Sequence, residues 1–130
     1  MSYMDVDLPP ITITTTDAER LSLLANGSSS RLPYVADYLV REIERASIVP
    51  PQQALLGLVR MGSRVTYRDG DSVREVTLVY PQEADIERKR ISILAPVGAA
   101  LIGLSVGQSI EYKTPSGEKR TLTVMHVGED

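Results

Sequence analysis

The chain contains no cysteine, no tryptophan and no phenylalanine, and its only histidine is His126. Without cysteine it can form no disulfide, no thiolate nucleophile and no cysteine-ligated metal site. A histidine-rich zinc site is equally excluded, and a Ser-His-Asp triad would depend on that one side chain. His126 lies in an alternating run near the C-terminus, so we interpret it as an edge-strand or surface residue. We expect no catalytic residue, no metal and no cofactor.

Clustered positive charge is also lacking. The 130 residues carry 14 Lys and Arg against 17 Asp and Glu, a net charge of −3, and the longest cationic run is Arg88 to Arg90. Because phosphate neutralisation requires clustered cations, we expect no direct sequence-specific contact with nucleic acid. The longest mostly apolar stretch, residues 91–109, is interrupted by proline and glycine, which argues against a membrane span. The N-terminus is acidic where a secretory signal is basic, so we expect a cytoplasmic protein.

Two regions with different periodicity follow one another, and we place the boundary between residues 1–49 and 50–130, at consecutive prolines. In the first region a capping box, Thr16 to Glu19, predicts a helix that ends at Asn26-Gly27. A second helix is expected to begin at Pro33 with one apolar stripe. The short link predicts an antiparallel helical hairpin. Helices this short bury too little surface to be stable alone, so the hairpin should pack against the second region.

From residue 59 onward the apolar residues alternate, which is typical of strands. A Gly- and Asp-rich turn at 68–72 predicts one hairpin, and the sequence Thr114 to Glu118 predicts another. Residues 91–94 read as a further strand, and Pro96 opens a short buried helix that we expect to end near Leu104. The prediction is an α+β protein whose antiparallel sheet carries one short helix on one face.

The segment 91–110, ISILAPVGAALIGLSVGQSI, resembles the C-terminal domain of the GreA/GreB transcript-cleavage factors of bacteria. The resemblance extends to residues 59–67 and 77–81, and within the family it is strongest to the short-armed Rnk group. It implies an FKBP-like fold for residues 50–130, preceded by a short antiparallel coiled coil over 1–49. It also implies a partner, RNA polymerase, bound near its secondary channel.

The arm of the cleavage factors is longer, and its acidic tip helps to hold magnesium in the polymerase active centre. Here the expected tip, residues 27–33, contains no carboxylate, although Mg²⁺ is usually held through one or two of them. Two helices of roughly 20 Å would also fall short of such a site. We therefore expect a protein that occupies the same entrance and competes with cleavage factors without stimulating cleavage.

The family resemblance suggests which residues touch the polymerase. They lie in the turn between the strand and the short helix and at the tip of the hairpin: Ala95, Pro96, Val97, Gly98, Arg31 and Leu32. The alternative is that proline and glycine only shape the turn and that the tip is an ordinary polar loop. Two carboxylate pairs, Asp69 with Asp71 and Asp85 with Glu87, are interpreted as surface charge, because both lie in turn-like sequence without a His, a Lys or a third carboxylate in register.

Two other functions stay open at this stage. An FKBP-like fold raises peptidyl-prolyl isomerisation, but that activity depends on a pocket of aromatic rings, and this chain has only its six tyrosines. Fold alone would not justify the assignment. The second possibility is direct modulation of nucleoside diphosphate kinase, which is the activity for which the Rnk group is named. Nothing in the residues themselves addresses it.

Overall fold

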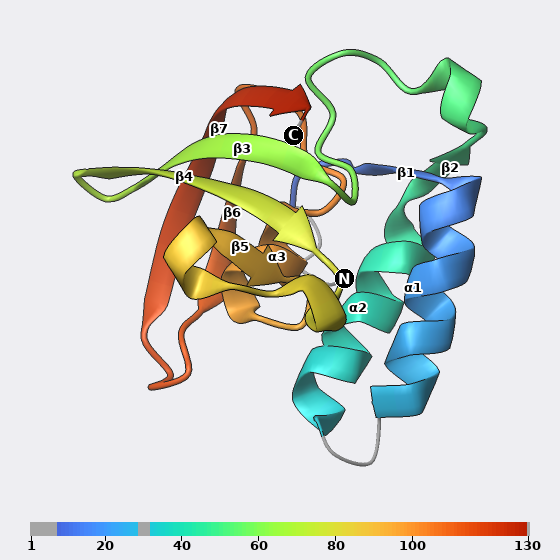
Figure 1. Cartoon of the computed structure of the whole chain (residues 1–130), viewed down its shortest axis with the longest axis horizontal. Coiled ribbons are helices and arrows are strands. Elements are labelled where there is room, and N and C mark those ends of the chain that lie inside the picture. The colour runs from blue at the N-terminus through green and yellow to red at the C-terminus, as the bar shows by residue number, and fades with distance from the viewer. Residues whose placement is uncertain (1–7, 29–31, 130) are drawn as a thin grey trace, which may run out of the picture.

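The computed structural model describes residues 8–28 and 32–129. Its first part is a helical hairpin, α1 (Thr15–Ser28) and α2 (Pro33–Arg45), which lie side by side (Figure 1). Two three-residue strands flank the hairpin, β1 (Thr12–Thr14) before it and β2 (Ser47–Val49) after it, and they pair in parallel. The expected hairpin is therefore present, and the strand pair at its base is an addition that the sequence did not predict.

The start of α1 lies slightly earlier than the capping box indicated. Thr14, not Thr16, supplies the cap: its Oγ1 accepts a hydrogen bond from the backbone N–H of Asp17 at 3.2 Å. The carboxylate of Asp17 is thereby available to the second region, where its Oδ2 accepts a bond from the N–H of Met61 at 3.1 Å. The start of α2 at Pro33 agrees with the prediction.

The second region is a strongly curved five-stranded sheet in the order β5-β4-β3-β7-β6 (Figure 1). Its strands are β3 (Ser63–Asp69), β4 (Ser72–Val79), β5 (Arg90–Ser92), β6 (Ser109–Lys113) and β7 (Lys119–Glu129). The 3₁₀ turn η1 (Pro51–Gln53) precedes the sheet. Two further 3₁₀ turns, η2 (Pro81–Glu83) and η3 (Ile86–Arg88), and one helix, α3 (Pro96–Leu101), lie between its strands. The α+β class is confirmed.

Two details of the sheet and its helix differ from expectation. β5 joins β4 in parallel, so the sheet is not wholly antiparallel. A parallel neighbour requires a crossover, and the two 3₁₀ turns between these strands provide it. α3 ends at Leu101 rather than near Leu104, because the chain reverses at Gly103, whose φ of +83° favours glycine.

A single apolar core joins both regions. It contains Ile13, Leu21 and Leu39 from the N-terminal part together with Leu78, Leu101 and Leu122 from the sheet and α3. These side chains are fully buried, and burial of a leucine or isoleucine contributes roughly 1.5–3 kcal/mol each. The hairpin thus packs against the second region, as its short helices required. Over the described ranges, no helix is long and apolar enough to cross a membrane.

Candidate partner-binding groove

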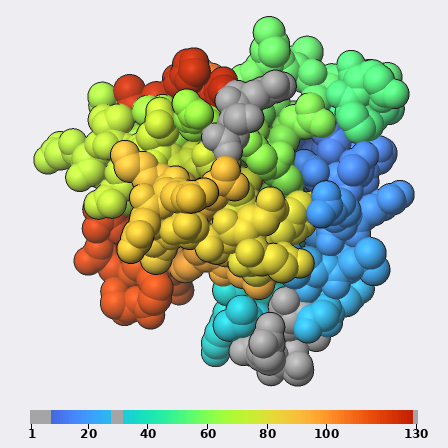
Figure 2. Space-filling model, in the orientation of Figure 1, coloured from blue at the N-terminus to red at the C-terminus, as the bar shows by residue number. Residues whose placement is uncertain are grey.

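An open groove of about 570 Å³ lies on the sheet region and is lined by residues of β3, β4, η3, β5, the start of α3 and β6. In Figure 2 the segments around η2 and η3, yellow to orange, lie between the β3–β4 hairpin and the blue helix α1. Apolar side chains dominate the lining, among them Val76, Ile86, Ile91 and Val97. Arg74, Glu75 and Lys89 add charge.

The turn into α3 is built by local hydrogen bonds. Ser92 Oγ accepts the N–H of Leu94 at 3.0 Å, and the carbonyl of Ser92 accepts the N–H of Ala95 at 2.9 Å. Ala95 is extended and Pro96 occupies the first turn of α3, where its missing N–H costs nothing. The chain therefore leaves β5 and enters α3 at once, so that the first turn of the helix lies at the groove.

Gly98 fixes how closely α3 approaches the strand. An added Cβ at this position would lie 2.2 Å from the carbonyl oxygen of Ser92 and 3.1 Å from Cα of Ile93. Only a residue without a side chain allows this approach. Gly98 is buried, so it shapes the turn and is not itself available to a partner.

The remaining residues expected at the partner surface are separated in the structure. Ala95, Pro96 and Val97 are half-buried and line the groove. Leu32, 41% exposed, precedes α2 and does not line the groove, while Arg31 lies outside the described residues. The groove thus brings together three of the six expected residues.

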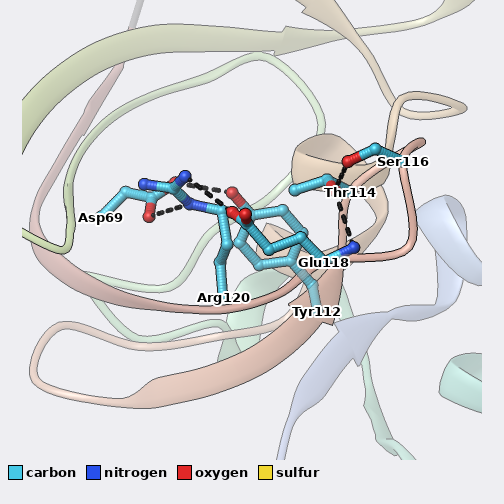
Figure 3. Close-up of polar contacts among 6 residues, drawn as sticks. All are labelled: Asp69, Tyr112, Thr114, Ser116, Glu118 and Arg120. Carbon is cyan, nitrogen blue, oxygen red and sulfur yellow. Dashed lines mark hydrogen bonds and ion pairs between the residues drawn. The ribbon is translucent and has the colours of Figure 1, made fainter.

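Tyr112 lines the groove, and its hydroxyl is bound by the buried carboxylate of Asp69 (Figure 3). Its hydroxyl donates a 2.6 Å hydrogen bond to Oδ2 of Asp69, and Nε of Arg120 donates to Oδ1 at 2.8 Å. Arg120 also bonds Glu118 at 3.1 Å. Asp69 is only 7% exposed, so its interpretation as surface charge was wrong.

The electrostatics of this cluster follow from burial and hydrogen bonding. Burial alone would raise the pKa of Asp69, but the bonds from Tyr112 and Arg120 outweigh it, and the pKa lies below its ordinary value. Burial, assisted by the bond to Asp69 and its negative charge, raises the pKa of the Tyr112 hydroxyl to about 12. At neutral pH the pair is therefore a neutral phenol that donates to an ionised carboxylate. Neither group exchanges its proton near pH 7, so the pair stabilises the fold and does not act as an acid or a base.

Most of the groove was missed by sequence reasoning. Ile86, 88% exposed, lies in a charged segment without periodicity, and Tyr67 is one buried residue among several on β3. An isoleucine in such a segment is no signal by itself, because single apolar side chains are common on protein surfaces. His126 is exposed on β7, as expected. Among the described residues no group of three His, Cys, Asp or Glu side chains could hold a metal ion.

Comparisons with known proteins agree with this architecture. Residues 50–129 match the family described as transcription elongation factor GreA/GreB, C-terminal, and residues 9–49 match the Rnk N-terminus. The regulator of nucleoside diphosphate kinase from Escherichia coli K12 is 42% identical over 123 residues, which cover 92% of this chain and 89% of that protein.

Longer relatives and a solved structure give the same result. GreA of Rickettsia felis is 42% identical over 86 residues, 62% of this chain and 53% of GreA, so the chain matches about half of that factor. A solved GreA/GreB elongation factor from Nitrosomonas europaea superimposes with a TM-score of 0.73 at 38% identity and covers 90% of this chain and 98% of that one.

Proposed function

The chain belongs to the GreA/GreB transcription elongation factor family, with an N-terminus of the Rnk type, and from that premise we propose that it binds RNA polymerase in the cytoplasm. Its relatives are regulators and transcription factors. In this proposal the protein docks near the secondary channel of the polymerase. It competes there with the transcript-cleavage factors and is not itself an enzyme.

The observation that carries the proposal is the groove at the start of α3. Ala95, Pro96 and Val97, the residues that the family resemblance assigns to the polymerase, lie together on its wall with their side chains half-buried. Half-buried apolar residues around a groove can bury further surface when a partner arrives, at about 25 cal/mol per Å². The tip residues Arg31 and Leu32 are proposed as a second, weaker contact.

The dimensions of the hairpin support a protein that occupies the secondary channel without stimulating transcript cleavage. α1 has 14 residues and α2 has 13, so each is about 20 Å long at 1.5 Å per residue. Residues 26–33, which comprise the end of α1, the link and the first residue of α2, contain neither Asp nor Glu. In this proposal the arm enters the secondary channel without presenting the carboxylates by which Mg²⁺ is usually held.

A pull-down with core RNA polymerase tests the docking. The chain should be retained by the intact polymerase and lost when the rim helices of the secondary channel are deleted. Binding that survives the deletion would reject this site, and no binding to either form would reject the partner.

A transcript-cleavage assay tests the mechanism. Backtracked complexes incubated with this protein should keep their RNA intact, whereas cleavage by a long-armed GreA should slow as the protein is added in excess. Cleavage in its presence alone would contradict the proposal. The same preparation should show no turnover in a prolyl-isomerisation assay.

The Escherichia coli relative is named for the regulation of nucleoside diphosphate kinase, and this suggests a second candidate function. In that case the protein would bind the kinase directly and change its rate. Purified kinase assayed with and without the protein separates the candidates, because a competitor at the polymerase leaves the isolated kinase unchanged.

A further inference from the structure

One edge of the sheet is only partly covered. β4 extends over Ser72–Val79, but β5 pairs only with its last part, Thr77 to Val79. Over Ser72–Val76, β4 has β3 on one side, and among the described residues no strand pairs with its other side. This uncovered part of β4 lies beside the groove, whose lining includes residues 73–76.

The backbone of that edge points outward at alternate residues. The N–H of Thr77 donates to the carbonyl of Lys89 at 2.8 Å on the β5 side, whereas the carbonyl of Leu78 accepts from Gly62 at 2.7 Å on the β3 side. Backbone groups alternate along a strand, so the N–H and C=O groups of residues 73 and 75 point to the uncovered side. Both residues are exposed.

The side chains around this edge are suited to a protein segment. Ile86 is 88% exposed and Val73 is 55% exposed, although each is apolar. Two cations, Arg74 and Lys89, also line the groove, against the single carboxylate of Glu75. An occupant that covers this surface should therefore bring an apolar side chain and a negative charge.

We propose that the uncovered edge of β4 and the adjoining groove bind an extended segment of a partner protein. The segment adds to the sheet as a further strand, with main-chain hydrogen bonds to residues 73 and 75. It seats an apolar side chain between Ile86 and Val97 and places a carboxylate beside Arg74 or Lys89. The inference goes beyond the proposed function, because it requires nothing of RNA polymerase.

Charge disfavours a second copy of the chain as the occupant. Two β4 edges paired with one another would bring four cations, Arg74 and Lys89 of both copies, to an interface with two Glu75 carboxylates. Like charges brought together at an interface are unfavourable. A partner with acidic residues avoids this repulsion, and its carboxylates are attracted to Arg74 and Lys89.

The test is a titration of the ¹⁵N-labelled full chain with an acetylated eight-residue peptide that alternates valine with threonine and has aspartate at both ends. We expect amide shifts at residues 73–76 and 86–97. Affinity should be weaker for the same peptide with lysine at both ends. The absence of shifts, or shifts elsewhere, would overturn the proposal. Shifts that appear on concentrating the protein alone would assign the edge to a second copy and overturn it too.

Matched variants separate the strand from the groove. Glu75→Pro removes one outward N–H and leaves the β3 ladder intact, so Kd should rise about three- to tenfold relative to Glu75→Ala. Ile86→Ser should weaken binding about tenfold, whereas Leu56→Ser, at a fully exposed leucine outside the groove, should not. Equal affinity of Glu75→Pro and Glu75→Ala overturns the added strand. If Glu75→Pro does not fold, the peptide-induced amide shifts at residues 73–76 decide the added strand, and their absence overturns it. Equal affinity of Ile86→Ser and Leu56→Ser overturns the groove contact.

These results can be read separately from the polymerase pull-down. A peptide that binds while polymerase does not would reject the proposed function alone. Polymerase binding without any peptide binding would reject only the inference about the β4 edge and its groove.

Discussion

The hydroxyl of Tyr112 on β6 reaches across an intervening strand to donate its hydrogen bond to Asp69 at the end of β3. β7 lies between these two strands and contributes Arg120 to the same carboxylate. Three neighbouring strands are thus tied together by one buried side chain. The ring of Tyr112 forms part of the groove wall, so this link also sets the shape of the groove.

Tyr112→Phe should destabilise the fold. The substitution keeps the ring but removes the bond to Asp69, whose buried carboxylate then keeps the bond from Arg120. A hydrogen bond to a charged group contributes about 1.5–3 kcal/mol. The free energy of unfolding, measured in urea, should fall by that amount. Tyr34→Phe, at a tyrosine that is 91% exposed, is the control and should change nothing. Equal stability of both variants would show that the bond carries no net energy.

The same residue predicts an alkaline loss of stability. The pKa of Tyr112 is raised to about 12 by burial and by Asp69, whereas an unfolded tyrosine titrates near 10. Above pH about 10 the unfolded chain releases this proton and the folded chain retains it, so stability falls as the pH rises toward 12. Burial raises the pKa of Tyr38 and Tyr67 as well. Tyr112→Phe should therefore reduce the alkaline fall without abolishing it, in urea unfolding at pH 9 and pH 11.

Gly98→Ala should be severe. The new methyl group would overlap the carbonyl oxygen of Ser92, which is backbone and cannot move aside cheaply. We expect a loss of about 3 kcal/mol or more in thermal unfolding. The matched control is Gly27→Ala in α1, where an added Cβ meets nothing within 4 Å. That substitution should stabilise the protein by about 0.5–1 kcal/mol. A similarly small effect of Gly98→Ala would contradict the close packing of α3 against Ser92.

Asp17→Ala should loosen the hairpin from the sheet region. Asp17 is 9% exposed, and its carboxylate accepts the N–H of Met61 across 44 residues of chain. Loss of this acceptor should cost about 1–3 kcal/mol and accelerate amide exchange in α1. Asp37→Ala removes only an exposed ion pair with Arg41 and should change stability by less than about 0.5 kcal/mol. Identical exchange in the two variants would contradict the role of Asp17.

The double variant Pro96→Ala, Val97→Asp should weaken binding to RNA polymerase. It places a charge on the apolar wall of the groove while leaving the buried residues of α3 in place. Binding is measured by pull-down, and circular dichroism checks that the protein remains folded. Unchanged affinity in a folded variant would remove this segment from the docking surface.

The elements that were predicted correctly are those whose sequence pattern lies within a few neighbouring residues. The hairpin of β3 and β4 follows from the turn around Gly70, and α2 follows from Pro33 and an apolar stripe. The strands β1 and β2 were missed because three residues are too few to establish a period. Their pairing joins Thr12 to Ser47, which no local pattern encodes.

The site was less predictable, because its parts come from distant positions. Only the turn at Ala95 to Val97 was anticipated, through its family resemblance. The burial of Asp69 depends on partners 43 and 51 residues away, Tyr112 and Arg120, so its Gly-Asp surroundings suggested an exposed turn instead. The uncovered edge of β4 arises because β5 is short, and strand length is poorly encoded in sequence.

The paired strands β1 and β2 fasten the chain where it enters and leaves the helices, and Arg45 adds a hydrogen bond to the carbonyl of Pro9 at the same place. The residues that make this anchorage, Thr12–Thr14, Ser47–Val49, Pro9 and Arg45, all lie at the base of the arm. Arm length is consequently a separable variable: whole helical turns inserted in matched numbers beyond Gly27 and before Leu32 would leave the anchorage untouched. A series of such lengthened proteins, each with carboxylates added at its tip, would measure the arm length at which an acidic tip begins to stimulate transcript cleavage by RNA polymerase.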